Sequence, residues 1–82
     1  MAASKTVQQL ISACPSGFDS TSDVSGWLAQ CYRWAEIEQY PEVKETSWIG
    51  LAKIDSLDAR REYRETVLSQ LNAIKDITVI NS

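Results

Sequence analysis

An apolar stripe over residues 22–40 is the strongest hydrophobic pattern in the chain. Its positions recur at spacings of three, four and seven, which places them on one face of an α-helix. The stripe consists of Val24, Trp27, Leu28, Cys31, Trp34 and Ala35. Pro41 follows, and because proline cannot continue a helix, this helix is expected to end by Tyr40.

A shorter pattern of the same kind predicts a helix over residues 4–14. Its apolar face consists of Val7, Leu10, Ile11 and Cys14. Ser4 can cap the start of this helix, and Pro15 ends it. The signal is weaker over residues 41–54, where we expect one or two short helices because Gly50 disfavours a single continuous one.

The last predicted helix covers residues 56–75. Its inner stripe consists of Ala59, Tyr63, Val67, Leu71 and Ile74. The charged residues of its first half are spaced to form ion pairs on the helix surface. The whole pattern predicts one all-α domain over residues 1–82, a small bundle of three or four helices. We expect the second and last helices to form the main pair.

Residues 76–82 differ from the rest of the chain because they are rich in β-branched side chains, which favour extended backbone. No second strand is evident elsewhere in the sequence, so we expect an extended C-terminal tail without a ladder partner. Such a tail can add a strand to a partner protein or lie across a second copy. Alternatively, it covers its own core as a strap or frays.

The composition indicates a small globular domain, with 82 residues, 44% hydrophobic residues and a formal net charge of -3. A chain of this length buries only about 60% of the surface that it exposes when unfolded, which favours oligomerisation. A nucleic-acid-binding protein normally carries a basic excess, so the negative charge argues against one. No apolar run suits a signal peptide or a membrane span. We therefore expect a soluble intracellular protein, virion-associated if it is viral.

The residue types that usually carry catalysis are scarce in this chain. Histidine is absent, and the three glycines stand apart, so neither an imidazole-activated nucleophile nor a phosphate-binding loop can form. Cys14 and Cys31 fall on apolar stripes and are expected to be reduced thiols, with one disulfide as the alternative. We expect no enzymatic activity, no cofactor, no metal site and no small-molecule substrate.

Large aromatic residues are instead frequent, and aromatic side chains dominate protein–protein contacts. Trp27 and Trp34 lie on the main stripe and are expected to be core residues. Three of the other aromatic residues, an isoleucine of the same helix as two of them, and three residues of the tail are the predicted partner-binding residues. These are Tyr32, Ile37, Tyr40, Trp48, Ile77, Val79 and Ile80.

A cluster of arginines near the start of the last helix offers a second kind of contact. Arg60, Arg61 and Arg64 lie within about one turn and could bind an anion or an acidic partner. Because acidic residues interleave with them, the alternative interpretation is a solvated surface crossed by ion pairs.

These patterns favour a noncatalytic protein–protein interaction or assembly component, such as a small structural or adaptor subunit. Short acidic helical chains with an extended arm are common in viral and phage structural proteins, which supplies a class-level analogy. The partner would be another protein or further copies of this chain. One alternative is a small acidic inhibitor that occupies a basic site on an enzyme or nucleic-acid-binding complex. A third is a small nucleic-acid-binding regulator, which would need the three arginines exposed together.

Overall fold

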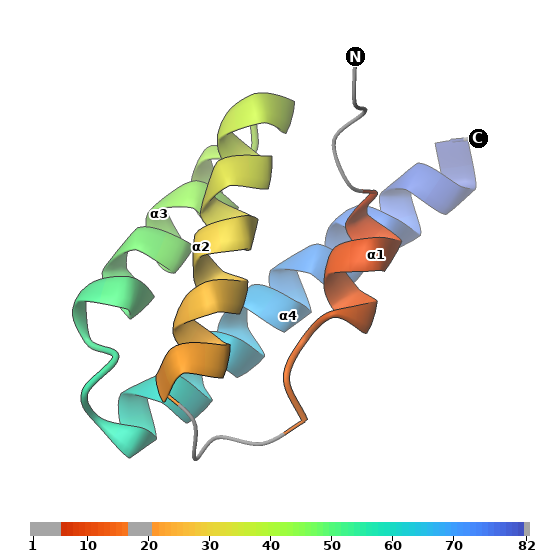
Figure 1. Ribbon diagram of the computed structural model, residues 1–82. Helices are drawn as coiled ribbons and strands as arrows, with labels where there is room; N and C mark the ends of the chain where they lie inside the picture. The colour runs from red at the N-terminus through yellow and green to blue at the C-terminus, as the bar shows by residue number, and fades with distance from the viewer. Residues whose placement is uncertain (1–5, 17–20, 82) are drawn as a thin grey trace.

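Four α-helices form the part of the chain that the computed structural model describes, residues 6–16 and 21–81 with side chains through Ile77. They are α1 (Val7–Ser12), α2 (Thr21–Glu38), α3 (Pro41–Ala52) and α4 (Leu57–Asn81) (Figure 1). No strand occurs in these residues, so the predicted all-α class is confirmed.

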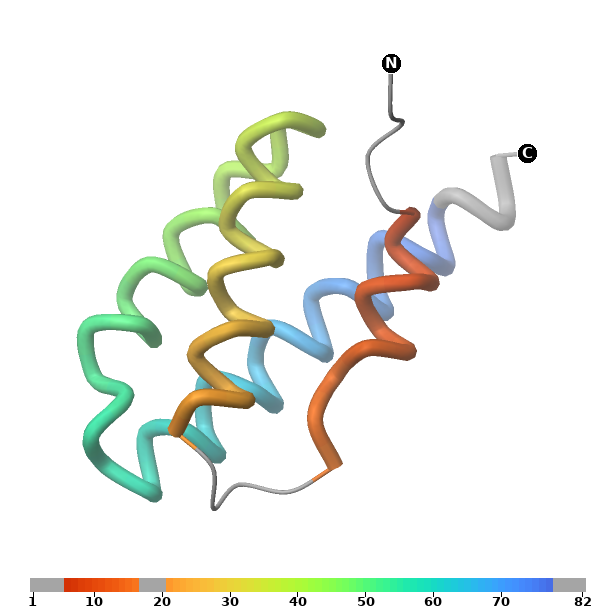
Figure 2. Tube along the Cα trace, in the orientation of Figure 1, coloured from red at the N-terminus to blue at the C-terminus, as the bar shows by residue number. Residues whose placement is uncertain are grey.

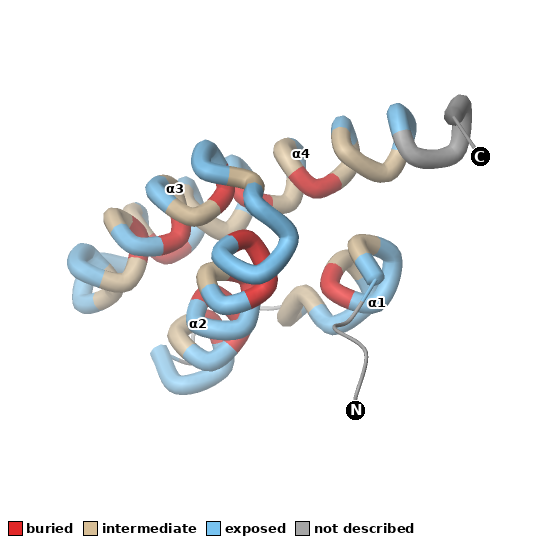
Figure 3. The backbone as a smooth tube through the Cα atoms, turned by 90° about the horizontal axis from the view of Figure 1, so that it is seen from above, coloured by how far each residue is buried: buried red, intermediate tan, exposed pale blue. Residues whose placement is uncertain are grey.

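α2 and α3 lie side by side in opposite directions and make the most extensive helix–helix contact (Figures 1 and 2). α4 crosses behind this pair, and α1 packs beside α4 (Figure 3). The main pair is therefore α2 with α3, which corrects the expectation of α2 with α4. Only two residues connect α2 to α3. Because so short a connection reverses the chain direction at once, α3 is placed directly against α2.

The turn between α2 and α3 is built by local interactions. Gln39 has a left-handed backbone with φ 64°, and the Tyr40 N–H donates to the Ala35 carbonyl at 2.8 Å, which is the pattern of a Schellman cap. The Tyr40 ring stacks on Trp34 with a centroid separation of 5.0 Å. Pro41 then starts α3, where its missing N–H costs no hydrogen bond.

The core lies between α2 and the other helices, and it contains the stripe predicted for α2. Its buried members are Leu10, Val24, Trp27, Leu28, Cys31, Trp34, Ala35, Val43, Val67 and Leu71. Trp27 and Trp34 are thus core residues, as predicted. The Trp27 indole Nε1–H also donates to the Leu10 carbonyl at 2.8 Å, which ties the C-terminal part of α1 to α2.

The inner face of α3 carries only small or medium side chains, because Val43, Ser47 and Gly50 are its buried residues. A Cβ atom on Gly50 would lie 2.9 Å from the Tyr63 Cβ and 3.2 Å from the Leu28 Cδ1. Glycine is therefore needed where α2, α3 and α4 meet. Of the one or two short helices expected over residues 41–54, the structure has one continuous helix, because this packing outweighs the low helix propensity of Gly50.

The starts of α2 and α4 lie within one residue of the predicted ones, whereas α1 (Val7–Ser12) is shorter than the helix predicted over residues 4–14. Thr6 caps α1 in a capping box with Gln9, while the predicted cap Ser4 lies outside the described residues. The hydroxyl of Ser56 accepts from the Ala59 N–H at 3.2 Å at the start of α4, as expected for a cap.

The end of α4 differs from the prediction of an extended tail after Lys75. Asp76 and Ile77 are helical, and the α4 backbone continues to Asn81. Once a helix is formed, each further residue adds a hydrogen bond, and the penalty for β-branched residues is below about 1 kcal/mol each. The side chains of Val79 and Ile80, and all of Ser82, lie outside the described residues.

A pair of glycine substitutions tests the close approach at Gly50. Gly50→Ala is expected to lower the free energy of unfolding by about 1–3 kcal/mol in urea titrations, because the new methyl group overpacks the contact with Tyr63. Gly26→Ala is the control, because Gly26 is exposed in α2 with nothing within 4 Å of the added Cβ. It is expected to raise stability by about 0.5–1 kcal/mol. Equal gains from both substitutions would contradict the packing described here.

Candidate functional site

An open groove between α2 and α3 brings together two of the predicted partner-binding residues. The rings of Tyr32 and Trp48 lie 5.6 Å apart at 39°, with Tyr32 half-buried and Trp48 61% exposed. The groove has a volume of about 340 Å³. Its lining, which we call the aromatic groove, consists of Tyr32, Pro41, Lys44, Glu45 and Trp48.

The charges around the aromatic groove are only partly compensated. The Lys44 ammonium pairs with the Glu36 carboxylate at 3.3 Å and lies 5.7 Å from the centroid of the Tyr32 ring. Glu45 is exposed, and among the described residues no cation or hydrogen-bond donor pairs with its carboxylate. The groove therefore combines an open indole face with one uncompensated negative charge.

The other predicted contact residues do not join this groove. Tyr40 is half-buried against Trp34 at the turn. Ile37 is 59% exposed, but it lies about 140° around the α2 axis from Tyr32, because the two residues are five positions apart. Ile77 is also exposed, on α4. The predicted partner-binding residues with described side chains on α2, α3 and α4 thus lie on different faces of the molecule, and of these only Tyr32 and Trp48 share a groove.

Two of the three clustered arginines point into the fold. Arg60 is 9% exposed and donates from Nη1 to the Ile54 carbonyl at 2.7 Å. Arg64 is half-buried and donates from Nε to the Pro15 carbonyl at 2.6 Å. Arg61 alone of the three is exposed. The condition for the nucleic-acid-binding hypothesis, three arginines exposed together, is therefore not met.

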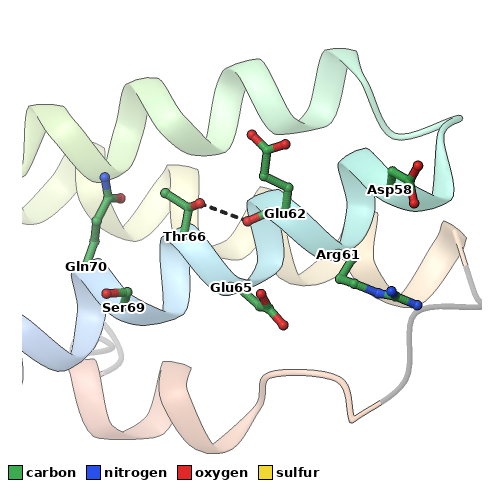
Figure 4. A pocket seen from close by; sticks show the side chains of 7 residues that line it. All are labelled: Asp58, Arg61, Glu62, Glu65, Thr66, Ser69 and Gln70. Atoms are coloured by element: carbon green, nitrogen blue, oxygen red, sulfur yellow. Dashed lines mark hydrogen bonds between the residues drawn. The ribbon is translucent and has the colours of Figure 1, made fainter.

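The outer face of α4 carries a second open groove of about 540 Å³ (Figure 4). Its lining, which we call the acidic face, consists of Asp58, Arg61, Glu62, Glu65, Thr66, Ser69 and Gln70. The Thr66 hydroxyl donates to the Glu62 carbonyl at 2.8 Å, so this side chain is held against the helix. The charge pattern of this region is also compatible with a solvated surface crossed by ion pairs, and the spacing of Asp58, Glu62 and Glu65 places three carboxylates on one side of the helix.

Neither cysteine forms a disulfide in the described part of the chain, and the two thiols lie in different surroundings. Cys31 is buried in the core, whereas Cys14 is half-buried at the end of the α1 segment. Burial raises the pKa of the Cys14 thiol above its usual value, and the nearby Arg64 guanidinium partly offsets this effect. A thiol in such a setting is mostly protonated at neutral pH and is a weak nucleophile.

Two further properties, metal binding and membrane crossing, concern the residues with described side chains. Among them, no three Cys, Asp or Glu side chains are grouped closely enough to hold a metal ion. None of the helices, over the same residues, has the length and apolar character needed to cross a membrane.

A matched pair of arginine substitutions tests the structural assignment of Arg60. Arg60→Ala is expected to lower the free energy of unfolding by about 1.5–3 kcal/mol, because it removes a charged hydrogen bond to the Ile54 carbonyl. Arg61→Ala removes the same charge from an exposed position and should change stability by less than about 0.5 kcal/mol. Urea unfolding followed by tryptophan fluorescence measures both values. Equal losses of unfolding free energy in the two variants would show that the hydrogen bond from Arg60 to the Ile54 carbonyl adds no stability beyond that of an exposed arginine.

The described residues thus form two candidate surfaces, the aromatic groove between α2 and α3 and the acidic face of α4. They lie on different helix faces and have different chemistry, one aromatic with a single free carboxylate and the other rich in carboxylates. No family model, curated protein or solved structure matches this chain.

Proposed function

We propose that this protein is a noncatalytic interaction or assembly component that binds another protein, or further copies of itself, through the aromatic groove. The observation that carries the proposal is the exposure of Trp48 beside the Tyr32 ring. Exposing a large indole to water is unfavourable, and its burial in a complex would recover about 25 cal/mol for each Å² of apolar surface.

The shape of the aromatic groove supports a docking role. The Tyr32 ring packs against the Trp48 ring, and the Lys44 ammonium lies over it, 5.7 Å from its centroid. These contacts hold the Tyr32 ring in place in the unbound protein. Side chains that are ordered in the free protein lose little conformational entropy on binding. Tryptophan and tyrosine are also enriched among the residues that contribute most to binding energy.

Residues 76–81 could contribute to binding as part of a helix and not as the extended arm expected from the sequence. The strand-adding arm expected from sequence needs extended backbone, whereas α4 remains helical through Ile77 and onward to Asn81. Ile77 is 59% exposed, so any contribution of this segment to assembly would come from a helix face. Such a contact would use apolar side chains rather than backbone hydrogen bonds.

Photo-cross-linking from position 48 tests the proposed function. A photoreactive phenylalanine analogue at position 48 is expected to yield a discrete protein adduct, in the source cell or between purified copies. The same analogue at position 62, on the acidic face, is the control and should yield little adduct. Native mass spectrometry of Trp48→Ala then shows whether a self-associated form is lost. A monomer at all concentrations, together with equal cross-linking from both positions, would overturn the proposal.

The acidic face supports a second candidate function, an inhibitor that occupies a basic site on another macromolecule. Asp58, Glu62 and Glu65 are all exposed there, and two of the cationic side chains of α4 are directed at backbone carbonyls instead. Exposed carboxylates attract a basic partner over a distance set by ionic strength, about 8–10 Å near physiological salt. This candidate uses a different surface from the aromatic groove.

Salt dependence distinguishes the two candidates. If the acidic face is the binding surface, raising the salt concentration from about 50 to about 500 mM should weaken association with the cross-linked partner steeply. If the aromatic groove is the surface, the same change should have little effect, because burial of apolar area is not screened. The double substitution Glu62→Gln with Glu65→Gln should weaken binding only in the first case.

A further inference from the structure

A comparison of two neighbouring ring–carboxylate pairs reveals a specific chemistry in the aromatic groove. In the first pair, the Tyr32 ring and the Glu36 carboxylate hold the Lys44 ammonium between them, at 5.7 Å from the ring centroid and 3.3 Å from Oε2. A cation is stabilised in this position by the negative face of the ring and by the opposite charge. This cation site is therefore filled from within the protein.

The second pair has the same components but no cation. Glu45 and Trp48 are three residues apart on α3, so their side chains share one face of the helix, and both line the groove. Trp48 is 61% exposed, and within the described part of the chain no basic side chain pairs with the Glu45 carboxylate. Indole is the best of the aromatic rings for binding a cation.

We propose that the Glu45–Trp48 pair is a binding site for an arginine side chain of a partner protein. The guanidinium would stack on the indole face of Trp48 and donate hydrogen bonds to the Glu45 carboxylate. Arginine fits better than lysine because its planar group can stack and present paired donors at the same time. This inference rests on the proposed function, and it adds the chemistry of the partner segment.

The surroundings of the site are consistent with a single cationic side chain. Lys44 also lines the groove, but its charge is compensated by Glu36, so the remaining local charge is that of Glu45. The volume of about 340 Å³ lies at the lower end of the range for small-molecule pockets, about 300–1,000 Å³. The net charge of -3 further favours the approach of a basic segment.

Nuclear magnetic resonance titration with two short peptides tests this inference. The probes are hexa-arginine and hexa-lysine, which carry equal charge, and the indole Nε1–H signal of Trp48 is assigned with the Trp48→Phe variant. Hexa-arginine is expected to shift the Trp48 signal and the amide signal of Glu45, with an affinity at least about 3-fold higher than that of hexa-lysine. Shifts confined to the acidic face of α4 would overturn the inference.

Two variants of equal charge separate a specific site from general attraction. Glu45→Gln should weaken hexa-arginine binding by about 3-fold or more, because it removes the carboxylate beside Trp48. Glu62→Gln removes one charge from the acidic face and should weaken binding less than about 1.5-fold. Equal losses in both variants would overturn the inference.

The outcomes for the arginine site and for the proposed function are distinguishable. A discrete cross-link from position 48 without any preference for hexa-arginine would overturn the arginine site and leave the docking role in place. The absence of a discrete cross-link and of self-association overturns the docking role whatever the peptides show.

Discussion

The close contact of three helices at Gly50 is the constraint on which the rest of the structure depends. The residue has no side chain, so α3 approaches both Tyr63 of α4 and Leu28 of α2. The inner face of α3 is consequently narrow, and a large ring cannot be placed there. Trp48 lies on the opposite face of α3, beside Tyr32, and remains exposed. The outward position of Trp48 follows from the helical periodicity of α3, in which two residues are about 200° apart, so that Gly50 faces the core and the indole does not.

Hydrogen bonds to backbone carbonyls connect the helices to the loops and ends beside them. The Trp27 indole binds the Leu10 carbonyl, Arg60 binds that of Ile54, and Arg64 binds that of Pro15. The Ile54 and Pro15 carbonyls lie in loops outside the helices, whereas the Leu10 carbonyl lies near the end of α1 and also accepts from the Ala13 N–H at 3.2 Å. Arg60 and Arg64 are thereby drawn toward the protein interior. In the sequence, arginines alternate with the acidic residues of α4, but with two of these arginines turned inward the outer face of the helix carries mainly carboxylates.

Periodicity predicted the helices well because burial of an apolar face is encoded at regular spacings. The stripe of α2 and the buried Val67 and Leu71 of α4 were found in this way. The arginines were harder to place, since Arg60, Arg61 and Arg64 have the same chemistry and differ only in which carbonyls the folded chain brings near. The end of α4 was missed because local propensity for extended backbone is weak compared with continued helix hydrogen bonding.

The sequence by itself determined the all-α class, the approximate positions of the helices and most of the core, because these follow from local spacing, caps and prolines. Only the tertiary structure decided that Tyr32 and Trp48 share a groove, that Lys44 is neutralised by Glu36 and that Glu45 keeps its charge uncompensated. These features depend on the direction and closeness with which α3 packs on α2. That packing depends on contacts between residues distant in sequence, such as Gly50 with Leu28 and Tyr63, which local periodicity does not predict.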